Sequence, residues 1–367
     1  MILMRLGLNK NGIIVPKRGE IKVMGQTQIL RTPSNALTRI NKVKENRSLN
    51  ALVLRGCGGI GDVLMTLPTV REIRKQYNIE RLDYATDFDY LDGALKKVLL
   101  YNKDIDNILE HQMVTEEQKD SYDIVVNLSC PCLVHEVPHA PSVNRIDLFA
   151  RHAGIGLTDT SISYTITSEE LTWAQQYLAQ NNIQKFILVQ SNSSTKNRDL
   201  PLLTLQRTVM GILKEMPGYK AVVITHGELD NDWNLCNVVR FHNYDIRNIA
   251  AIMNYSELVL CPDSAILHLA GALHKKIVSF FGPTDPYARV NYYENAIAIC
   301  AAKELQCFWC WYTRSCHGTM ICWKLLKEDM IIEPSLSILK NEFLEEKDYL
   351  INFDRYSKNI KKTYDEL

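Results

Sequence analysis

The sequence predicts an α/β protein with two Rossmann-like lobes. Two series of short apolar runs alternate with amphipathic segments, which is the pattern of parallel strands covered by helices. A helical stretch at 168–183 separates the two series. The 46% hydrophobic share of 367 residues is enough for two cores of ordinary domain size. Disordered chains and small disulfide-stapled folds are therefore excluded.

The first series of elements predicts an N-terminal lobe at 50–167. A buried strand is expected at 51–55 and a helix at 63–77, with further strands at 81–85 and 122–127. A basic extension, 1–49, precedes the lobe. Residues 1–50 hold ten Lys or Arg and only two acids. We interpret this stretch as a solvated extension, with an arm that contacts lipopolysaccharide, membrane or a neighbouring subunit as the alternative.

The second series predicts a C-terminal lobe at 168–345, which includes a Cys-rich finger at 300–323 and is followed by a helical tail at 346–367. Ser168 provides a capping-box-like start for the first helix of this lobe. Strands are expected at 186–190, 221–225, 257–261 and 276–280, and helices at 202–216, 245–254 and 266–273.

Charge and hydropathy limit the partners and the compartment. The formal net charge is zero, so the total does not indicate a nucleic-acid-binding surface, and we expect no nucleic-acid partner. No run approaches the roughly 18 apolar residues that a bilayer span needs. Arg5 lies too early in a short apolar stretch for an export signal. A cytoplasmic protein is expected.

The first chemical motif, Arg55-Gly-Cys-Gly-Gly-Ile-Gly-Asp62, lies where a strand turns into a helix. Its glycines permit close backbone approach, and the free amides at a helix start attract an anion. Asp62 directly follows the last glycine. It is interpreted either as a helix cap or as a general base at the carboxyl ends of the strands.

The second motif is the strand–turn–helix segment at 260–270, which contains Asp263, Ser264 and His268. Asp263 is placed to cap the helix, while Ser264 and the amides after it offer donors to a diphosphate. His268 falls on the same helix face as Ser264, either as a structural histidine or as part of a binding site. A Gly-Pro turn at 281–286 follows the next strand.

Four cysteines lie within sixteen residues, as Cys307, Cys310, Cys316 and Cys322. In a cytoplasmic chain this density favours a structural metal over disulfides, with unconnected buried thiols as the alternative. Four thiolates leave no open position for a substrate, and zinc is the default ion for such a site.

Together these motifs resemble glycosyltransferase family 9, the ADP-heptose heptosyltransferases of lipopolysaccharide assembly. The resemblance covers roughly residues 50–335 and is carried by four segments, 52–75, 193–201, 224–232 and 258–286. It implies a GT-B architecture, in which two Rossmann-like lobes face each other across a cleft. The implied reaction is an inverting transfer of heptose from ADP-heptose to a bacterial surface acceptor.

The resemblance also implies roles for individual residues. Asp62 matches the catalytic base, and Arg198, with Lys196 as a possible substitute, matches the cation that balances the departing diphosphate. The implied donor-binding residues are Gly59, Gly61, Lys196, Glu228, Asp263, Ser264, Ala265, His268 and Thr284. Two positions depart from the family pattern, because Ala265 replaces a glycine and Leu200 replaces a tryptophan.

The cysteine pattern is similar to the metal finger of the autotransporter heptosyltransferase branch of this family, where the metal is iron. Iron or zinc is therefore expected at the four cysteines, and no catalytic metal. The branch leaves the acceptor open between a lipopolysaccharide core sugar and an adhesin serine. The protein is then expected to act in the cytoplasm, with a peripheral position at the inner membrane and a homo-oligomeric state as further possibilities.

Two hypotheses from other functional classes remain. An NAD-dependent oxidoreductase would use the first glycine loop, and Asp83 is the one plausible ribose-binding acid, but the second motif would be unexplained. A non-catalytic nucleotide-sugar-binding or scaffold protein would keep the fold without turnover.

Overall fold

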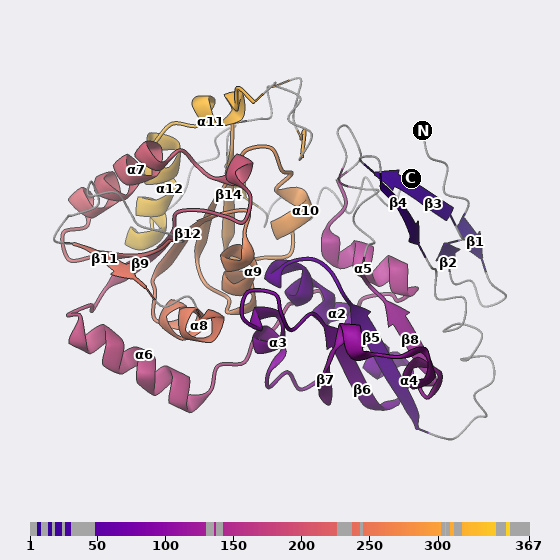
Figure 1. The fold of residues 1–367 in the computed structure, drawn as a ribbon. Helices are drawn as coiled ribbons and strands as arrows, with labels where there is room; N and C mark the ends of the chain where they lie inside the picture. The colour runs from indigo at the N-terminus through magenta and orange to yellow at the C-terminus, as the bar shows by residue number, and fades with distance from the viewer. Residues whose placement is uncertain are drawn as a thin grey trace. The chain divides into compact units, whose positions relative to one another are not determined.

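The chain divides into two compact units, each of which is described by itself. The first contains Met1–Val134 and Arg145–Thr165, and the second contains His135–Asn144 and Ile166–Leu367. The computed structural model describes residues 6–8, 14–16, 19–23, 26–30, 48–129, 136, 142–225, 237–242, 245–301, 305, 309–311, 318–342 and 350–352 (Figure 1).

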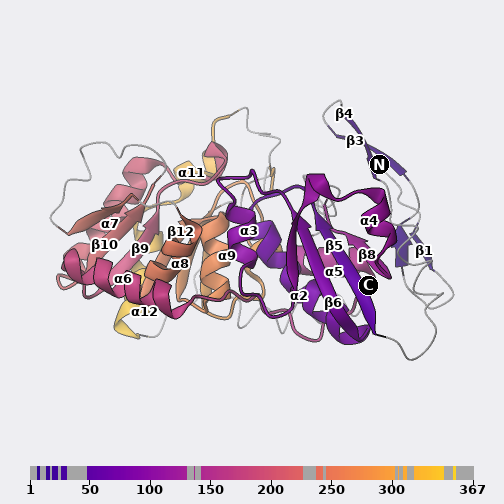
Figure 2. The same ribbon diagram turned by 60° about the horizontal axis from the view of Figure 1, so that its bottom comes forward.

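The first unit is built on a four-stranded parallel sheet. Its strands are β5 (Leu49–Arg55), β6 (Ile79–Thr86), β7 (Asn107–Glu110) and β8 (Ile124–Asn127), in the spatial order β7-β6-β5-β8. In the register of the central strand β5, Val53 lies opposite Tyr84 on one side and Val126 on the other. The strands β5, β6 and β8 lie side by side in both ribbon views (Figures 1 and 2).

The helices of the first unit follow the strands in α/β alternation. They are α2 (Ile60–Gln76), α3 (Ala94–Leu99), α4 (Glu116–Asp120) and α5 (Arg145–Ala153), with a 3₁₀ turn, η1, at His111–Met113. The helix α2 packs against α5, and most of its residues from Ile60 to Ile73 are buried. Because helices cover the sheet, β5 is apolar and buried almost throughout, as expected for a parallel strand.

Two hairpins form in the segment that the sequence predicts to be only a basic extension. β1 (Leu6–Leu8) pairs with β2 (Ile14–Pro16), and β3 (Gly19–Val23) pairs with β4 (Gln26–Leu30), both antiparallel. The hairpins were not foreseen because the high density of Lys and Arg obscures the short alternating patterns.

The second unit contains a seven-stranded sheet in the order β11-β10-β9-β12-β13-β14-β15. Six strands are parallel, and β15 pairs antiparallel with β14. The strands are β9 (Phe186–Gln190), β10 (Lys220–Ile224), β11 (Val238–Phe241), β12 (Leu258–Pro262), β13 (Ile277–Phe281), β14 (Ala296–Cys300) and β15 (Leu350–Asn352). The helices are α6 (Ser168–Gln180), α7 (Leu202–Glu215), α8 (Ile246–Asn254), α9 (Ala265–Ala272), α10 (Tyr287–Val290), α11 (Ile321–Leu325) and α12 (Asp329–Lys340), with a 3₁₀ turn, η2, at Lys196–Arg198.

The α/β class with two parallel sheets is confirmed, and each strand and helix expected between 51 and 281 is present within a few residues of its predicted bounds. Two local expectations were wrong. Thr167, rather than Ser168, is the N-cap of α6 and forms a capping box with Glu170. Within the expected helical tail, residues 350–352 form strand β15, because they extend the sheet at the free edge of β14.

Candidate functional site

Both sheets reverse their strand order once, and the sequence motifs lie at these points. In the first unit the chain runs outward from β5 to β7 and then returns to place β8 on the other side of β5. In the second unit it runs from β9 to β11 and returns to place β12 beside β9. Ligands of open α/β sheets bind at the carboxyl ends of the strands that flank such a reversal.

In the first unit the glycine loop after β5 is joined to the end of β8. Gly56 N donates to Ser129 Oγ at 3.1 Å, and the Arg55 guanidinium donates to the carbonyls of Leu128 and Ser129. Arg55 is almost fully buried, and its Cζ lies 5.0 Å from the centre of the Phe149 ring. The loop is therefore held against β8 by backbone and arginine contacts.

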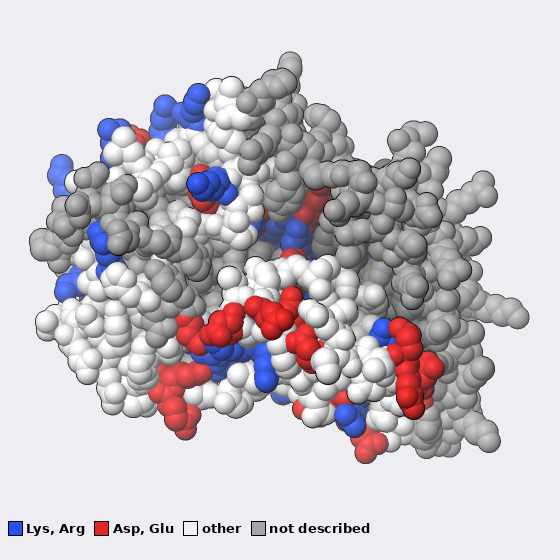
Figure 3. All heavy atoms as spheres, in the orientation of Figure 1, with Lys and Arg blue, Asp and Glu red and all other residues white. Residues whose placement is uncertain are grey.

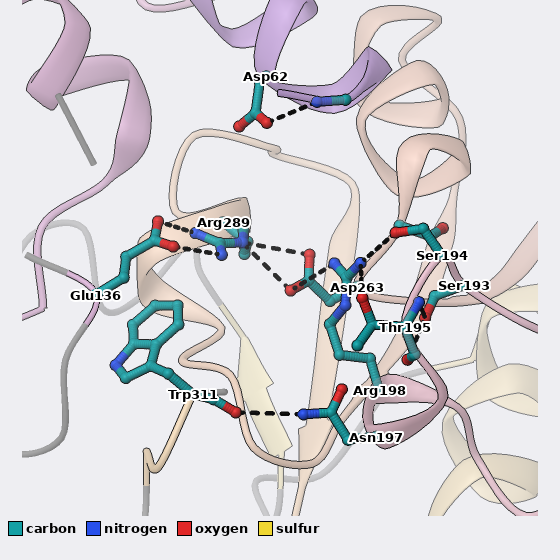
Figure 4. Close-up of polar contacts among 12 residues, drawn as sticks. Asp62, Glu136, Ser193, Ser194, Thr195, Asn197, Arg198, Asp263, Arg289 and Trp311 are labelled. Atoms are coloured by element: carbon teal, nitrogen blue, oxygen red, sulfur yellow. Dashed lines mark hydrogen bonds and ion pairs between the residues drawn. The ribbon is translucent and has the colours of Figure 1, made fainter. Parts of the chain in front are cut away.

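Asp62 is both a cap and an ion-pair partner. It occupies the third position of α2, where its Oδ2 accepts from Gly59 N at 2.9 Å (Figure 4). The same oxygen lies 3.5 Å from Arg55 Nη2, and Oδ1 is paired with Arg145 Nη1. With 14% of its side chain exposed, this carboxylate lies between two permanently charged guanidinium groups. The cap interpretation of Asp62 is confirmed geometrically, and its catalytic role stays a prediction.

The glycines of the loop allow the arginine and the carboxylate to approach. Gly58 has a φ of +97°, and a Cβ there would overlap the Arg55 guanidinium and lie 2.6 Å from Asp62 Oδ2. Gly59 is the N-cap of α2, and Gly61 is buried in its first turn. The absence of a side chain at Gly58 thus allows Arg55 and Asp62 to approach each other.

In the second unit the reversal point joins the ends of β9 and β12. Ser264 is the N-cap of α9, but its hydroxyl donates to Gln190 Oε1 instead of capping the helix. Ala265, which departs from the family pattern, is the first residue of the helix. The expectation that Asp263 caps α9 was wrong, because its carboxylate is directed to arginines.

Asp263 is the centre of a buried charge network, which Figure 4 shows. Its two oxygens lie 3.3 Å from Arg289 Nε, and Oδ2 lies 3.4 Å from Arg198 Nη1. Arg289 also pairs with Glu136 at both guanidinium ends, at 2.8 and 3.3 Å. Asp263 and Arg289 are 2% and 1% exposed, so these contacts lack the solvent screening of surface pairs.

Arg198, the predicted cation, lies on the 3₁₀ turn η2 and is brought to Asp263. Its Nη2 donates to Ser194 Oγ at 2.8 Å, and its Nε is buried without a hydrogen-bond partner among the residues that the structure describes. An arginine N–H in that position is available to an anionic acceptor. Lys196, the alternative cation, is exposed, and no contact links it to Asp263 in the described part of the chain.

His268 is buried one turn into α9. Its Nδ1 lies 2.6 Å from Tyr293 OH, and burial raises the pKa of that phenol well above its ordinary value. A neutral phenol can donate to an imidazole nitrogen, which orients the ring. The contact gives His268 a structural partner, and its role in donor binding stays a prediction.

The Gly-Pro turn carries two fully buried polar side chains. Thr284 Oγ1 and Asp285 Oδ2 have no hydrogen-bond partner among the described residues. Burial raises the pKa of Asp285 to about 7, while the backbone N–H of Tyr287 and the nearby Arg289 act in the opposite direction. Thr284, which is predicted to bind the sugar donor, is therefore next to a carboxyl group whose pKa is raised.

Several predicted residues lie outside the described part of the chain, namely Glu228, Cys307 and Cys316. The remaining two cysteines of the predicted metal finger, Cys310 and Cys322, are both buried. Within the described residues, no group of three or more His, Cys, Asp or Glu is gathered as a metal site. The metal finger stays a prediction.

The sequence motifs gave no indication of the residues that pair with the carboxylates of Asp62 and Asp263. Arg145, Glu136 and Arg289 lie in segments without a glycine signature, and each meets its partner only through the tertiary fold. Asp83, the ribose-binding acid of the oxidoreductase hypothesis, is instead fully buried. Arg81, Asn107 and Tyr122 all donate to its oxygens.

Surface features agree with the balanced composition. On the face drawn in Figure 3, acidic and basic side chains of the described residues are interspersed. No helix among the described residues has the length and apolar character needed to cross a membrane.

Comparison with known proteins gives a family match over the second motif. Residues 240–314 match the model of glycosyltransferase family 9 (heptosyltransferase). A stretch of 111 residues is 28% identical to lipooligosaccharide heptosyltransferase 2 of Campylobacter jejuni. That alignment covers 30% of this chain and 33% of the relative, so the chain spans about a third of the length of the curated relative it matches.

Solved structures share the fold over most of the chain. A family 9 glycosyltransferase from Veillonella parvula has a TM-score of 0.65 at 18% identity, covering 82% of this chain and all (100%) of that one. TibC, an iron-containing dodecameric glycosyltransferase from enterotoxigenic Escherichia coli, has a TM-score of 0.59 at 11% identity, covering 90% and 82%. A second TibC structure, with a TM-score of 0.57, contains ADP-D-β-D-heptose.

At such identities the structural similarity establishes the fold alone. The matched segment 240–314 contains Asp263, Ser264 and His268, which carry the second motif. The match to the glycosyltransferase family 9 model is therefore confined to the segment of the second unit that carries this motif.

Proposed function

We propose that this protein is an inverting glycosyltransferase that moves a heptose from ADP-heptose to a bacterial surface acceptor. The observation that carries the proposal is the environment of Asp263 at the start of α9. There Arg198 presents a buried N–H without a partner among the described residues, at the reversal point where α/β sheets bind ligands.

The donor diphosphate is proposed to bind at this helix start. The Ser264 hydroxyl is not used as a helix cap, so the first amides of α9 are not capped by it. Arg198 contacts Asp263 at 3.4 Å, which is a long ion pair, and a diphosphate would compete for this guanidinium. As the bond between the anomeric carbon and the diphosphate oxygen breaks, negative charge grows on the diphosphate and its attraction to Arg198 increases.

Asp62 is the proposed general base on the acceptor. It would accept the proton of the acceptor hydroxyl while that oxygen attacks the anomeric carbon and ADP departs. Arg55, Arg145 and the N–H of Gly59 fix the carboxylate, and each of its oxygens has more than one lone pair. The arginines therefore orient the carboxylate for this role.

The acceptor is proposed to be a sugar of a lipid-linked surface saccharide, in keeping with the matched lipooligosaccharide heptosyltransferase 2. An adhesin serine is the second candidate, favoured by the fold similarity to TibC. In either case we propose that the enzyme acts in the cytoplasm or at the cytoplasmic face of the inner membrane.

A structural metal is proposed at Cys307, Cys310, Cys316 and Cys322. The fit to the described residues is partial: Cys310 and Cys322 are both buried, as the ligands of a closed site would be. Iron is the first candidate, because TibC contains iron, and zinc is the second. Metal analysis of protein purified without added ions tests this point.

The oxidoreductase hypothesis is disfavoured by Asp83, which is occupied by three side-chain donors and is not available to a ribose. A scaffold role without turnover remains the second hypothesis. One experiment separates them: the protein is incubated with ADP-, GDP-, UDP- and dTDP-sugars, with and without a truncated lipooligosaccharide or an adhesin fragment, and nucleotide release is measured.

We expect ADP release that requires ADP-heptose and increases with the correct acceptor. Preference for a different nucleotide sugar would refute the donor. Binding of ADP-heptose without release of ADP in the presence of any acceptor would favour the scaffold hypothesis. Binding of NAD would favour the oxidoreductase hypothesis.

A further inference from the structure

Two tryptophans of the Cys-rich segment contact both loops of the proposed donor site. Each follows a cysteine directly, as Cys310-Trp311 and Cys322-Trp323, and both indoles are buried. The loops that they contact are the Arg198 segment, 193–201, and the turn at 281–286. These contacts lie entirely within the second unit.

The first contact point is Asn197, the residue before Arg198. Its backbone carbonyl accepts from Trp323 Nε1 at 2.8 Å, and its Nδ2 donates to the carbonyl of Trp311 at 3.5 Å, a contact drawn in Figure 4. Asn197 is 6% exposed, so both bonds lie away from water, where a lost partner is costly.

Without Asn197, the hydrogen bonds of this turn in the described residues are mainly local. Arg198 N donates to Thr195 O at 2.9 Å, and Ser193 N donates to Asp199 Oδ1 at 2.5 Å. Such bonds shape the turn but do not fix its position on the sheet. The bonds to Trp311 and Trp323 join it to residues more than one hundred positions away, as the sequence separations of 114 and 126 show.

The second contact point is the turn before Thr284. Trp311 N donates to Pro283 O at 2.8 Å, and the Trp323 indole lies against Gly282 so closely that a Cβ there would be 2.5 Å from its Cζ2. The Trp311 ring also lies 5.0 Å from Arg289 Cζ, which holds Asp263. The two tryptophans therefore contact the Arg198 turn, the Gly282-Pro283 turn and Arg289, Trp323 through its indole and Trp311 through its backbone and its ring.

We propose that Asn197, Trp311 and Trp323 are positioning residues that hold the Arg198 turn and the Gly282-Pro283 turn in the geometry that binds the donor diphosphate. The inference rests on the proposed function and extends it, because it gives the Cys-rich segment a task in donor binding. Arg198 meets the diphosphate, and the two tryptophans act through it.

The test measures ADP binding by calorimetry on the full chain. Trp323→Phe keeps an aromatic ring but removes the N–H that binds Asn197 and shortens the side chain on the edge of the indole that lies against Gly282. We expect its Kd for ADP to rise about three- to tenfold, the effect of one buried hydrogen bond. Trp173→Phe is the matched control, because Trp173 lies on α6, where it stacks on Tyr177. Its Kd should stay within about twofold of the wild type.

A double-mutant cycle separates positioning from general packing. In the Arg198→Gln background, Trp323→Phe should add less than about twofold, because the group that it positions is already gone. An equal loss in both backgrounds, or a wild-type Kd in Trp323→Phe, would overturn the inference while sparing the proposed function. If the wild type itself fails to bind ADP, the proposed function fails.

A second variant covers the case in which Trp323→Phe unfolds. Asn197→Ser keeps the backbone carbonyl and loses the bond to Trp311, so it should weaken ADP binding in the same direction, measured at a temperature at which the melting curve shows the variant to be folded. A wild-type Kd for this variant would contradict the inference as directly as the first.

Discussion

Arg289 and Glu136 form a two-point ion pair, with Nη1 and Nη2 at 2.8 and 3.3 Å from the two carboxylate oxygens. Their side chains are 1% and 7% exposed. The same guanidinium reaches Asp263 through Nε, so one arginine is shared by two acids. Such a pair is costly to break, because the remaining charge is left buried and only partly compensated.

Replacing Glu136 by Gln should therefore destabilise the second unit. The amide keeps one acceptor for Arg289 but loses the charge, and Asp263 still compensates in part, so we expect a loss of about 1–3 kcal/mol in the free energy of unfolding. Urea denaturation measures it. Glu116→Gln is the control, because Glu116 is 79% exposed and pairs with Lys119 on the surface. That change should cost about 0.5 kcal/mol or less.

Replacing Asp62 by Asn should abolish most transfer while preserving donor binding. Loss of a general base lowers the rate by roughly 10²–10⁴-fold. The expected readout is ADP release at saturating acceptor, together with an unchanged Kd for ADP. Asp159→Asn serves as the control, since Asp159 also pairs with an arginine, Arg71, but lies far along the chain from the glycine loop. Full activity of Asp62→Asn would leave only the helix-capping role.

Replacing Gly58 by Ala tests the support of Asp62 by the loop backbone. The positive φ and the overlap of a Cβ with Arg55 both oppose the change, so we expect a destabilisation of about 1–3 kcal/mol and a lower transfer rate. Gly156→Ala is the matched control, because a Cβ there has no neighbour within 4 Å. Equal melting temperatures for the two variants would show that the loop relaxes freely.

The sequence predicted the strand–turn–helix segments because their signals are local. Glycines after a buried strand, a short polar residue at a helix start and the alternation of apolar runs all lie within about twenty residues. Asp62 and Asp263 could therefore be singled out from these local signals, whereas Arg198 was identified only by the resemblance to a known family.

The partners of these residues could not be predicted in the same way. Glu136 meets Arg289 across 153 residues, and Arg145 meets Asp62 across 83. Nothing local distinguishes such residues from solvated charges. Asp263 illustrates the consequence: its position suggests a helix cap, yet two long-range arginines compete successfully for its carboxylate.

Asp285 links the stability of the second unit to pH. Burial raises its pKa to about 7, from the ordinary aspartate value of 3.8 that applies in the unfolded chain. Between these two values the folded state holds a proton that the unfolded chain has released. The stabilising contribution of this group is therefore fully present below pH 3.8 and is lost as the pH rises through about 7.

Asp285→Asn removes this titration and keeps an acceptor for the N–H of Tyr287. We expect the wild type to lose stability relative to the variant between pH 5 and pH 8, measured as the difference between their urea midpoints. Asp106→Asn is the control, because the pKa of Asp106 is shifted in the opposite direction. The hydrogen bond from Arg74 lowers this pKa, so Asp106 stays ionised in both the folded and the unfolded chain between pH 5 and pH 8. Its substitution should shift the midpoint equally at the two pH values. A constant difference for Asp285→Asn as well would mean that water reaches this carboxyl group and leaves it ionised in the folded protein, since a group that is charged on both sides of the unfolding equilibrium adds no slope with pH.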